Sequence, residues 1–310
     1  MLAFRQAFLA LALLLLPALA ATAQAADALV SAAWVQQNLR APNVVFLDVQ
    51  SGRNYERRHV PGAVHTRYPD DGWRKIQSDG RISLPTPVEF ATMMGRLGIR
   101  NTDHVVLVAT GGSDRDMSIA TDIYWTLLYF GHEEVSILNG GLNALNALGG
   151  GRDREVHTRP AAEYVLGRRR AAILATARDA IGSMGVGAMA DHRPQAQWLG
   201  LNKVSYVPVP GSIPTANSLP GDWLMKDGGG FFREKDELTR IFEYTKVATQ
   251  GKTIHIGNSS MEGSLGWFAA YEILGNKNAR LYAGGMADWG RDPQNPVRIH
   301  LGIDSAPAGN

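Results

Sequence analysis

A pattern of strands, glycines and helices occurs twice along this 310-residue chain. A β-branched run over 104–112 leads through glycines into a helical stretch over 119–130, and 252–258 leads in the same way into 265–274. Gly275 follows Gly131, the first helix stop, by 144 residues, and Gly284 follows Gly140 by the same interval. Strands that alternate with helices predict two α/β domains, each a mainly parallel sheet flanked by helices on both faces.

The repeat also sets the expected domain bounds. We predict an N-terminal domain over 26–150, a linker over 151–170 and a C-terminal domain over 171–310. The linker is basic, and we interpret its charges as solvated rather than as a ligand site.

The first 25 residues have the features of a secretory signal. Arg5 precedes an apolar run from about 8 to 20, and Ala23-Gln24-Ala25 is a small-residue cleavage site. The run is shorter than the ~20 residues that span a bilayer, so we expect cleavage rather than stable membrane insertion. The expected location of the mature chain is the bacterial periplasm.

Composition excludes several classes of function. The formal charge is +2, from 31 basic and 29 acidic side chains, which gives no broad cationic field for nucleic acid. The chain contains no cysteine, which excludes disulfides, thiolate metal sites and a cysteine persulfide. No histidine pair at i, i+4 accompanies a glutamate, so a zinc hydrolase site is not visible and neither a metal nor a cofactor is expected.

Short motifs in both copies resemble the rhodanese domain. Leu47-Asp48-Val49, the turn His59-Val60-Pro61-Gly62-Ala63 and Tyr129-Phe130-Gly131-His132 are similar to its strand, turn and helix-end signatures. The second copy continues the resemblance over 267–282 and 289–293. The tandem order is similar to that of the thiosulfate and 3-mercaptopyruvate sulfurtransferases, over nearly all of the mature chain.

The resemblance implies where the reactive loop lies. In this family a loop that begins with cysteine follows the fourth strand of the second domain. Counting back from Trp267-Phe268 places Gly257 at the cysteine position, in a loop formed by Gly257, Asn258, Ser259, Ser260, Met261, Glu262 and Gly263. Its backbone N–H groups are expected to form an anion cradle at a helix N-terminus. With glycine as the first residue, the chain is predicted to be a pseudoenzyme that forms no persulfide.

A non-catalytic binding role is therefore the first hypothesis, with either a small sulfur oxyanion or a periplasmic protein as partner. The expected ligand-binding residues are Arg193, Gly257, Asn258 and Ser259, because Arg193 resembles the substrate-contacting arginine of the family. A salt bridge at the surface is the alternative for Arg193. Glu262 either opposes a bound anion or is an acid favoured by the helix dipole.

A second hypothesis keeps the chain an enzyme. Ser259 or Ser260 would act as nucleophile of a transferase or hydrolase, with His255 as base. His255 lies in an otherwise apolar strand, which favours a buried, hydrogen-bonded histidine instead.

The loop over 110–118 in the first copy allows two interpretations. Its glycines and Arg115 permit a phosphate or sulfate cradle. Asp114 and Asp116 flank the arginine with opposite charge, which favours a structural loop.

Overall fold

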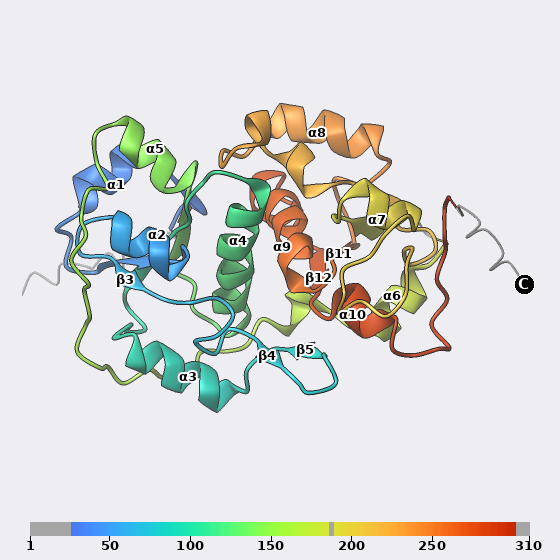
Figure 1. Ribbon diagram of the computed structural model, residues 1–310, viewed down its shortest axis with the longest axis horizontal. Coiled ribbons are helices and arrows are strands. Elements are labelled where there is room, and N and C mark those ends of the chain that lie inside the picture. The colour runs from blue at the N-terminus through green and yellow to red at the C-terminus, as the bar shows by residue number, and fades with distance from the viewer. Residues whose placement is uncertain (1–25, 186–188, 302–310) are drawn as a thin grey trace, which may run out of the picture.

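The computed structural model describes residues 26–185 and 189–301. The predicted signal over 1–25 lies outside the described residues. Two five-stranded parallel sheets form the framework, and they confirm the predicted α/β class. The two halves of the molecule lie side by side in Figure 1. None of the helices in the described ranges has the length and apolar character needed to cross a bilayer.

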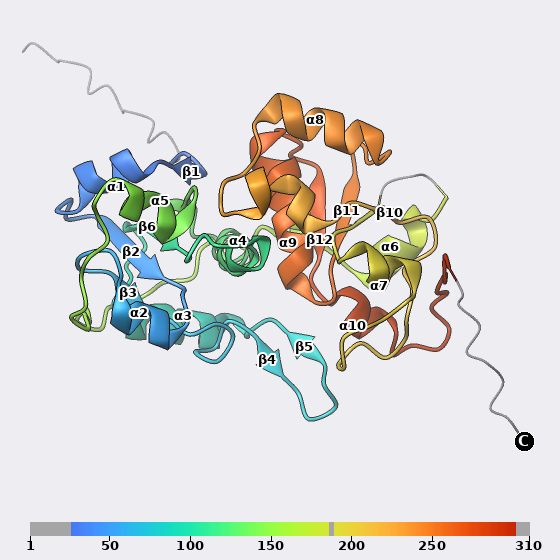
Figure 2. The ribbon, with the colours of Figure 1, turned by 45° about the horizontal axis from the view of Figure 1, so that its top comes forward.

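The first sheet has the strand order β1-β7-β6-β2-β3, and every pair in it is parallel. Its strands are β1 (Leu29–Val30), β2 (Val44–Asp48), β3 (Val64–His65), β6 (His104–Val108) and β7 (Val135–Leu138). The helices of this half are α1 (Ala32–Asn38), α2 (Gly52–Arg57), α3 (Pro87–Arg96), α4 (Asp114–Tyr129) and α5 (Gly141–Ala147). An antiparallel hairpin, β4 (Lys75–Ile76) and β5 (Ile82–Ser83), extends toward the other half (Figure 2).

The second sheet repeats this plan with the order β10-β9-β11-β12-β8, again all parallel. Its strands are β8 (Leu174–Ala175), β9 (Met189–Asp191), β10 (Asn217–Ser218), β11 (Thr253–Ile256) and β12 (Ala279–Tyr282). The helices are α6 (Ala177–Ser183), α7 (Gln195–Leu199), α8 (Lys235–Tyr244), α9 (Ser260–Phe268) and α10 (Gly285–Trp289), with a π-helical turn over Ala269–Ile273.

Apolar side chains alternate between the two faces of the first sheet. Phe46 packs in the cluster under α1 and α5, whereas Val45 and Leu47 pack in a larger cluster with α3 and α4. This larger cluster continues into the second half through Leu265 and Phe268 of α9. Helices α4 and α9 lie side by side at the centre of the molecule, so the two halves share one apolar core (Figures 1 and 2).

Two expectations about element bounds need correction. Helix α4 begins at Asp114 rather than near 119, because the Ser113 Oγ accepts a hydrogen bond from the Asp116 N–H and caps the helix there. Helix α9 begins at Ser260 rather than at 265. The predicted stops hold: Gly131 and Gly275 have positive φ, the conformation that ends a helix without strain in glycine alone.

The segment over 151–170 contains no helix or strand and lies against the first half rather than in solvent. The N–H of Ala162 donates to the Gly95 carbonyl, the Arg159 guanidinium pairs with Asp103, and Tyr164 is buried. The basic side chains of Arg152, Arg154, Arg168 and Arg169 are exposed to solvent. Arg159 and Arg170 instead pair with acids of the first half.

Candidate functional site

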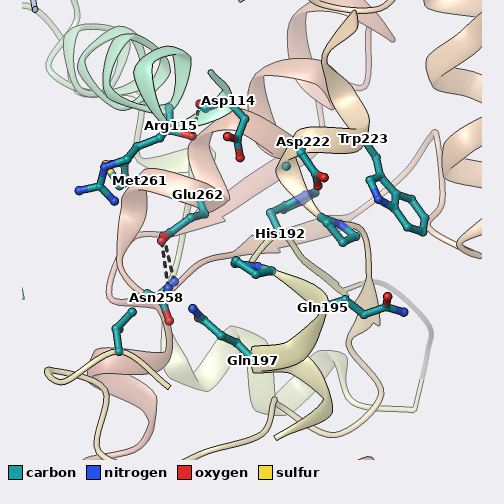
Figure 3. Close-up of a pocket in the computed structure, with 15 residues that line it drawn as sticks. Asp114, Arg115, His192, Gln195, Gln197, Asp222, Trp223, Asn258, Met261 and Glu262 are labelled. Carbon is teal, nitrogen blue, oxygen red and sulfur yellow. Dashed lines mark hydrogen bonds between the residues drawn. The ribbon is translucent and has the colours of Figure 1, made fainter. Parts of the chain in front are cut away.

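The candidate loop lies at the carboxyl end of the second sheet, where sites of parallel α/β proteins form. Gly257 is the first residue after β11, and α9 begins three residues later. A cleft of about 570 Å³ opens beside the loop. Its walls are the first turn of α4, the segment after β9, the turn over 220–223 and the loop itself (Figure 3).

The Glu262 side chain folds back into the loop. Its Oε2 accepts a hydrogen bond from the Asn258 N–H at 3.1 Å, and its Oε1 accepts one from Asn258 Nδ2 at 3.0 Å (Figure 3). Glu262 is also the third residue of α9, where the helix dipole favours an acid. The two interpretations of Glu262 thus describe one arrangement, in which a carboxylate belonging to the chain itself takes hydrogen bonds from the loop.

Gly257 has no space for a side chain in this loop. A Cβ at Gly257 would lie 2.7 Å from Glu262 Oε2, 2.7 Å from the Gly263 nitrogen and 2.8 Å from the Ser259 oxygen. Two of these neighbours are backbone atoms, so a larger residue requires the loop to widen. The backbone N–H groups of Ser260 and Met261 have no hydrogen-bond acceptor within the described ranges, so the loop keeps unused donors.

Ser260 is fully buried between the two halves. Its Oγ donates to Asp122 at 3.0 Å and accepts from Arg74 Nε at 2.9 Å, while Asp122 forms a buried ion pair with Arg74. The Tyr68 hydroxyl also donates to Asp122. This network fixes Ser260 as a link between α4 and α9. It leaves the hydroxyl no approach to a substrate.

His255 is buried and bonded to His192 rather than to either serine. His192 Nδ1 donates to the Leu219 carbonyl at 2.8 Å, so its Nε2 accepts from His255 Nδ1, also at 2.8 Å. Burial lowers the pKa of His192 to about 4. Burial and then the neighbouring His192 lower the pKa of His255 well below its usual value. Both rings are neutral hydrogen-bond partners, and neither is placed as the base of a serine nucleophile.

Arg193 is buried, and its guanidinium bonds to groups inside the protein. Its Nε and Nη2 donate to the Asp191 carboxylate at 2.9 and 2.6 Å, and Nη2 also donates to the Gly211 carbonyl. Burial would raise the pKa of Asp191, but the Arg193 charge and its hydrogen bonds hold it below its usual value. Arg193 does not line the cleft, and its Nη1 has no partner among the described residues. The salt bridge expected at the surface is in fact internal.

The charge of the cleft is predominantly negative. Asp114, Asp222 and Glu262 line it, with Arg115 as the one cation among the lining residues (Figure 3). The described residues of the cleft include no group of three side chains close enough to hold a metal. In the loop before α4 the Gly112 N–H donates to the Asp116 carboxylate at 2.9 Å, and Arg115 faces the cleft.

Comparison with known proteins identifies a rhodanese-like domain in the first half of the chain. The family model described as "Rhodanese-like domain" matches residues 31–148. These residues belong to the rhodanese-like domain family. A Mycobacterium leprae relative provisionally named thiosulfate sulfurtransferase SseA is 29% identical over 91% of this chain and 93% of its own length. The sulfur carrier protein TtuD of Thermus thermophilus is 28% identical over 85% of this chain and 94% of its own.

Solved structures share the fold of nearly the whole chain. Tum1 of Saccharomyces cerevisiae superposes with a TM-score of 0.75 and 18% identity, over 89% of this chain and 99% of its own. SseA of Escherichia coli, described as a 3-mercaptopyruvate sulfotransferase, superposes with a TM-score of 0.70 and 24% identity, over 84% of this chain and 99% of its own. At these identities the likeness shows the fold alone.

Several residues of the site have no sequence signal. Arg74, Asp122, Asp222 and Trp223 come from segments far apart in the chain, and only the packing of the two halves brings them together. His192 had a signal that could have been used: it directly follows the strand-end Asp191 and therefore lies at the carboxyl edge of the sheet.

Proposed function

We propose that this rhodanese-family protein does not transfer sulfur and instead uses its inter-domain cleft to bind a partner. One observation carries the proposal: Glu262 occupies the loop beside Gly257, which has no nucleophile and no room for one. Sulfur transfer is the activity in the relatives' names, and it requires a group that can carry the sulfur atom.

The charge of the cleft favours one partner class over the other. A sulfur oxyanion would meet three carboxylates, and it would have to displace Glu262 from the Asn258 N–H. A periplasmic protein that presents lysine or arginine side chains would instead pair with Asp114, Asp222 and Glu262. We therefore propose a protein partner with a basic contact segment.

An enzyme that uses the loop serines has weaker support. Ser260 is bonded to Asp122 and Arg74, and among the described residues no hydrogen bond joins His255 to Ser259 or Ser260. A serine without an adjacent base is a weak nucleophile.

Thiosulfate–cyanide turnover tests the loss of sulfur transfer. We expect no thiocyanate above background from the native protein and little from Gly257→Cys, whose thiol is crowded by Glu262. The double variant Gly257→Cys/Glu262→Ala should be the most active of the three. Thiocyanate formation by the native protein above background would overturn the proposal.

Peptide binding tests the partner class. A fluorescent hexa-arginine peptide should bind the native protein, and Asp222→Asn and Asp114→Asn should each weaken binding, as should added salt. A hexa-glutamate peptide is the matched probe of opposite charge. Tighter binding of the acidic peptide would contradict the assignment.

A further inference from the structure

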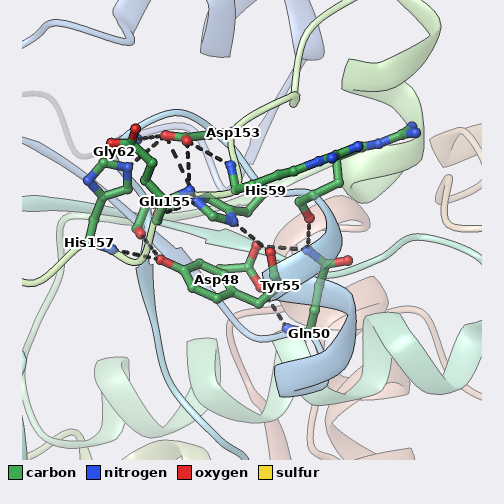
Figure 4. A network of polar contacts seen from close by, with 11 residues as sticks. Asp48, Gln50, Tyr55, His59, Gly62, Asp153, Glu155 and His157 are labelled. Carbon is green, nitrogen blue, oxygen red and sulfur yellow. Dashed lines mark hydrogen bonds and ion pairs between the residues drawn. The ribbon is translucent and has the colours of Figure 1, made fainter.

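Three metal-ligating side chains meet in the first half, far from the cleft. His59 comes from the turn after α2, and Asp153 and His157 come from the segment that leaves α5 (Figure 4). Asp153 Oδ2 lies 2.7 Å from His157 Nε2 and 3.9 Å from His59 Nε2. The ligand atoms of all three side chains lie within 4.8 Å of one another.

Backbone contacts hold these side chains together independently of any ligand. The His59 N–H donates to the Asp153 carbonyl at 3.0 Å, and the Asp153 N–H donates back at 3.2 Å. His157 forms a parallel bridge with Val64, and its N–H donates to the Tyr55 hydroxyl. The Tyr55 ring stacks on His59 with centroids 3.9 Å apart, which fixes the imidazole plane. The cluster is therefore preorganised by the fold.

Both ring nitrogens of His59 face backbone carbonyl oxygens. Nδ1 lies 2.7 Å from the Tyr55 carbonyl, and Nε2 lies 3.0 Å from the Glu155 carbonyl (Figure 4). A neutral imidazole has one N–H, so if Nδ1 donates, the Nε2 lone pair and the Glu155 oxygen face each other. A metal ion bound to Nε2 would also contact the Glu155 carbonyl oxygen and would remove the repulsion between the two lone pairs. A backbone carbonyl that orients the other ring nitrogen is the usual partner of a metal-bound histidine.

We propose that His59 Nε2, the Asp153 carboxylate and His157 Nε2 bind a divalent transition metal of the zinc type. Two imidazole nitrogens and one carboxylate suit zinc, which completes a tetrahedron with water. At metal–ligand distances near 2.1 Å, neighbouring ligand atoms are about 3.3 Å apart, between the two distances from Asp153. His59 is fully buried, while Asp153 and His157 are partly exposed, which gives the ion a route in.

The ion would attach the inter-domain segment to the first domain. Asp153 and His157 lie at the start of that segment, and His59 belongs to the turn beside β3. The site is structural and does not depend on the chemistry of the cleft. The sequence could not show it, because His59 and Asp153 are far apart and neither lies in a helical i, i+4 pair of histidines.

Zinc binding to untagged, chelator-treated protein tests the proposal. Calorimetry with zinc chloride should give one saturable site, and the same titration should raise the melting temperature. Cobalt should give the visible absorption of a tetrahedral site. His157→Ala should weaken zinc binding by more than roughly tenfold, and Asp153→Asn should do likewise.

A matched control and a contrary result complete the test. His300→Gln removes a histidine that stacks on Trp198 in the second half, and it should leave zinc binding unchanged. His157 is partly exposed, so His157→Ala is expected to fold, and circular dichroism checks this. Absence of saturable binding by the native protein, or zinc binding by His157→Ala and Asp153→Asn that is as tight as that of the native protein, would overturn the site.

Discussion

The aspartates that end β2 and β9 occupy matching places, but their pKa values are shifted in opposite directions. Asp48 pairs in register with the last residue of β6, and Asp191 with the last residue of β11. Burial raises the pKa of Asp48 to about 6, because Gln50 offers only uncharged donors. At Asp191 the effect of burial is outweighed by Arg193, and the pKa falls. The second copy therefore has a cation, Arg193, as part of its internal scaffold.

The two loops differ less than the two aspartates. Each helix that follows has an acid at its third residue, Asp116 in α4 and Glu262 in α9. Each acid accepts from the N–H of the residue just before the helix cap, Gly112 in one copy and Asn258 in the other. The second loop thus closes in the same way as the loop of the first copy.

The largest expected effect on the free energy of unfolding comes from replacing Arg193 by glutamine, which makes the Asp191–Arg193 pair resemble Asp48–Gln50. Arg193→Gln leaves Asp191 buried without its cation, and should lower the free energy of unfolding by about 3–5 kcal/mol at pH 7.5. Urea denaturation measures this. Asp191→Asn/Arg193→Gln removes both charges and should lose less than the single variant. A loss below about 1 kcal/mol for Arg193→Gln would refute the scaffold role.

Asp48→Asn should change how the free energy of unfolding depends on pH. Because the folded pKa of about 6 exceeds the ordinary 3.8, the folded state holds its proton more tightly than the unfolded chain. Native stability attributable to Asp48 is present below pH 4 and lost as pH rises through 6, a change of roughly 3 kcal/mol. Relative to native, Asp48→Asn should gain stability from pH 4 to 7.5.

The free energy of unfolding of Asp48→Asn must be compared with that of the native protein at each pH. His192, with a pKa of about 4, makes native stability rise over the same range, because the unfolded imidazole takes up a proton below about 6.5. The two trends oppose each other in the native protein. A stability difference between native and Asp48→Asn that stays constant with pH would show that Asp48 has an ordinary pKa.

The smallest effect concerns the two loop acids. Glu262→Gln removes a charge at a helix N-terminus and should cost about 1 kcal/mol by urea denaturation. Asp116→Asn is the matched change in the first loop and should cost a similar amount. A cost for Glu262→Gln several times that of Asp116→Asn would show that the two loops are not equivalent.

The fold could be predicted from the repeat because strands and helices depend on local sequence patterns. Apolar β-branched runs form the central strands, and Gly131 and Gly275 end the helices as expected. The position of Gly257 directly after β11 also follows from these patterns. The helix starts were missed, since the cap at Ser113 and the acids after it were interpreted as a loop.

The chemistry of the site was less predictable because it depends on packing between distant segments. The sequence gives no indication that Ser260 is hydrogen-bonded to Asp122 and Arg74, because those residues are far from it in the chain. An arginine at position 193 could pair with a bound anion or with an internal carboxylate, and the sequence does not distinguish the two. Only the geometry of Asp191 and Gly211 shows that it is internal.

Calorimetric titration of thiosulfate into the native protein and into Glu262→Ala tests the central claim, that the carboxylate of Glu262 takes the place of an anion in the loop. The native protein should show no saturable heat, and Glu262→Ala should bind thiosulfate through the freed Asn258 N–H and the unused donors of α9. Saturable binding by the native protein, with no gain in affinity when Glu262 is removed, would contradict it.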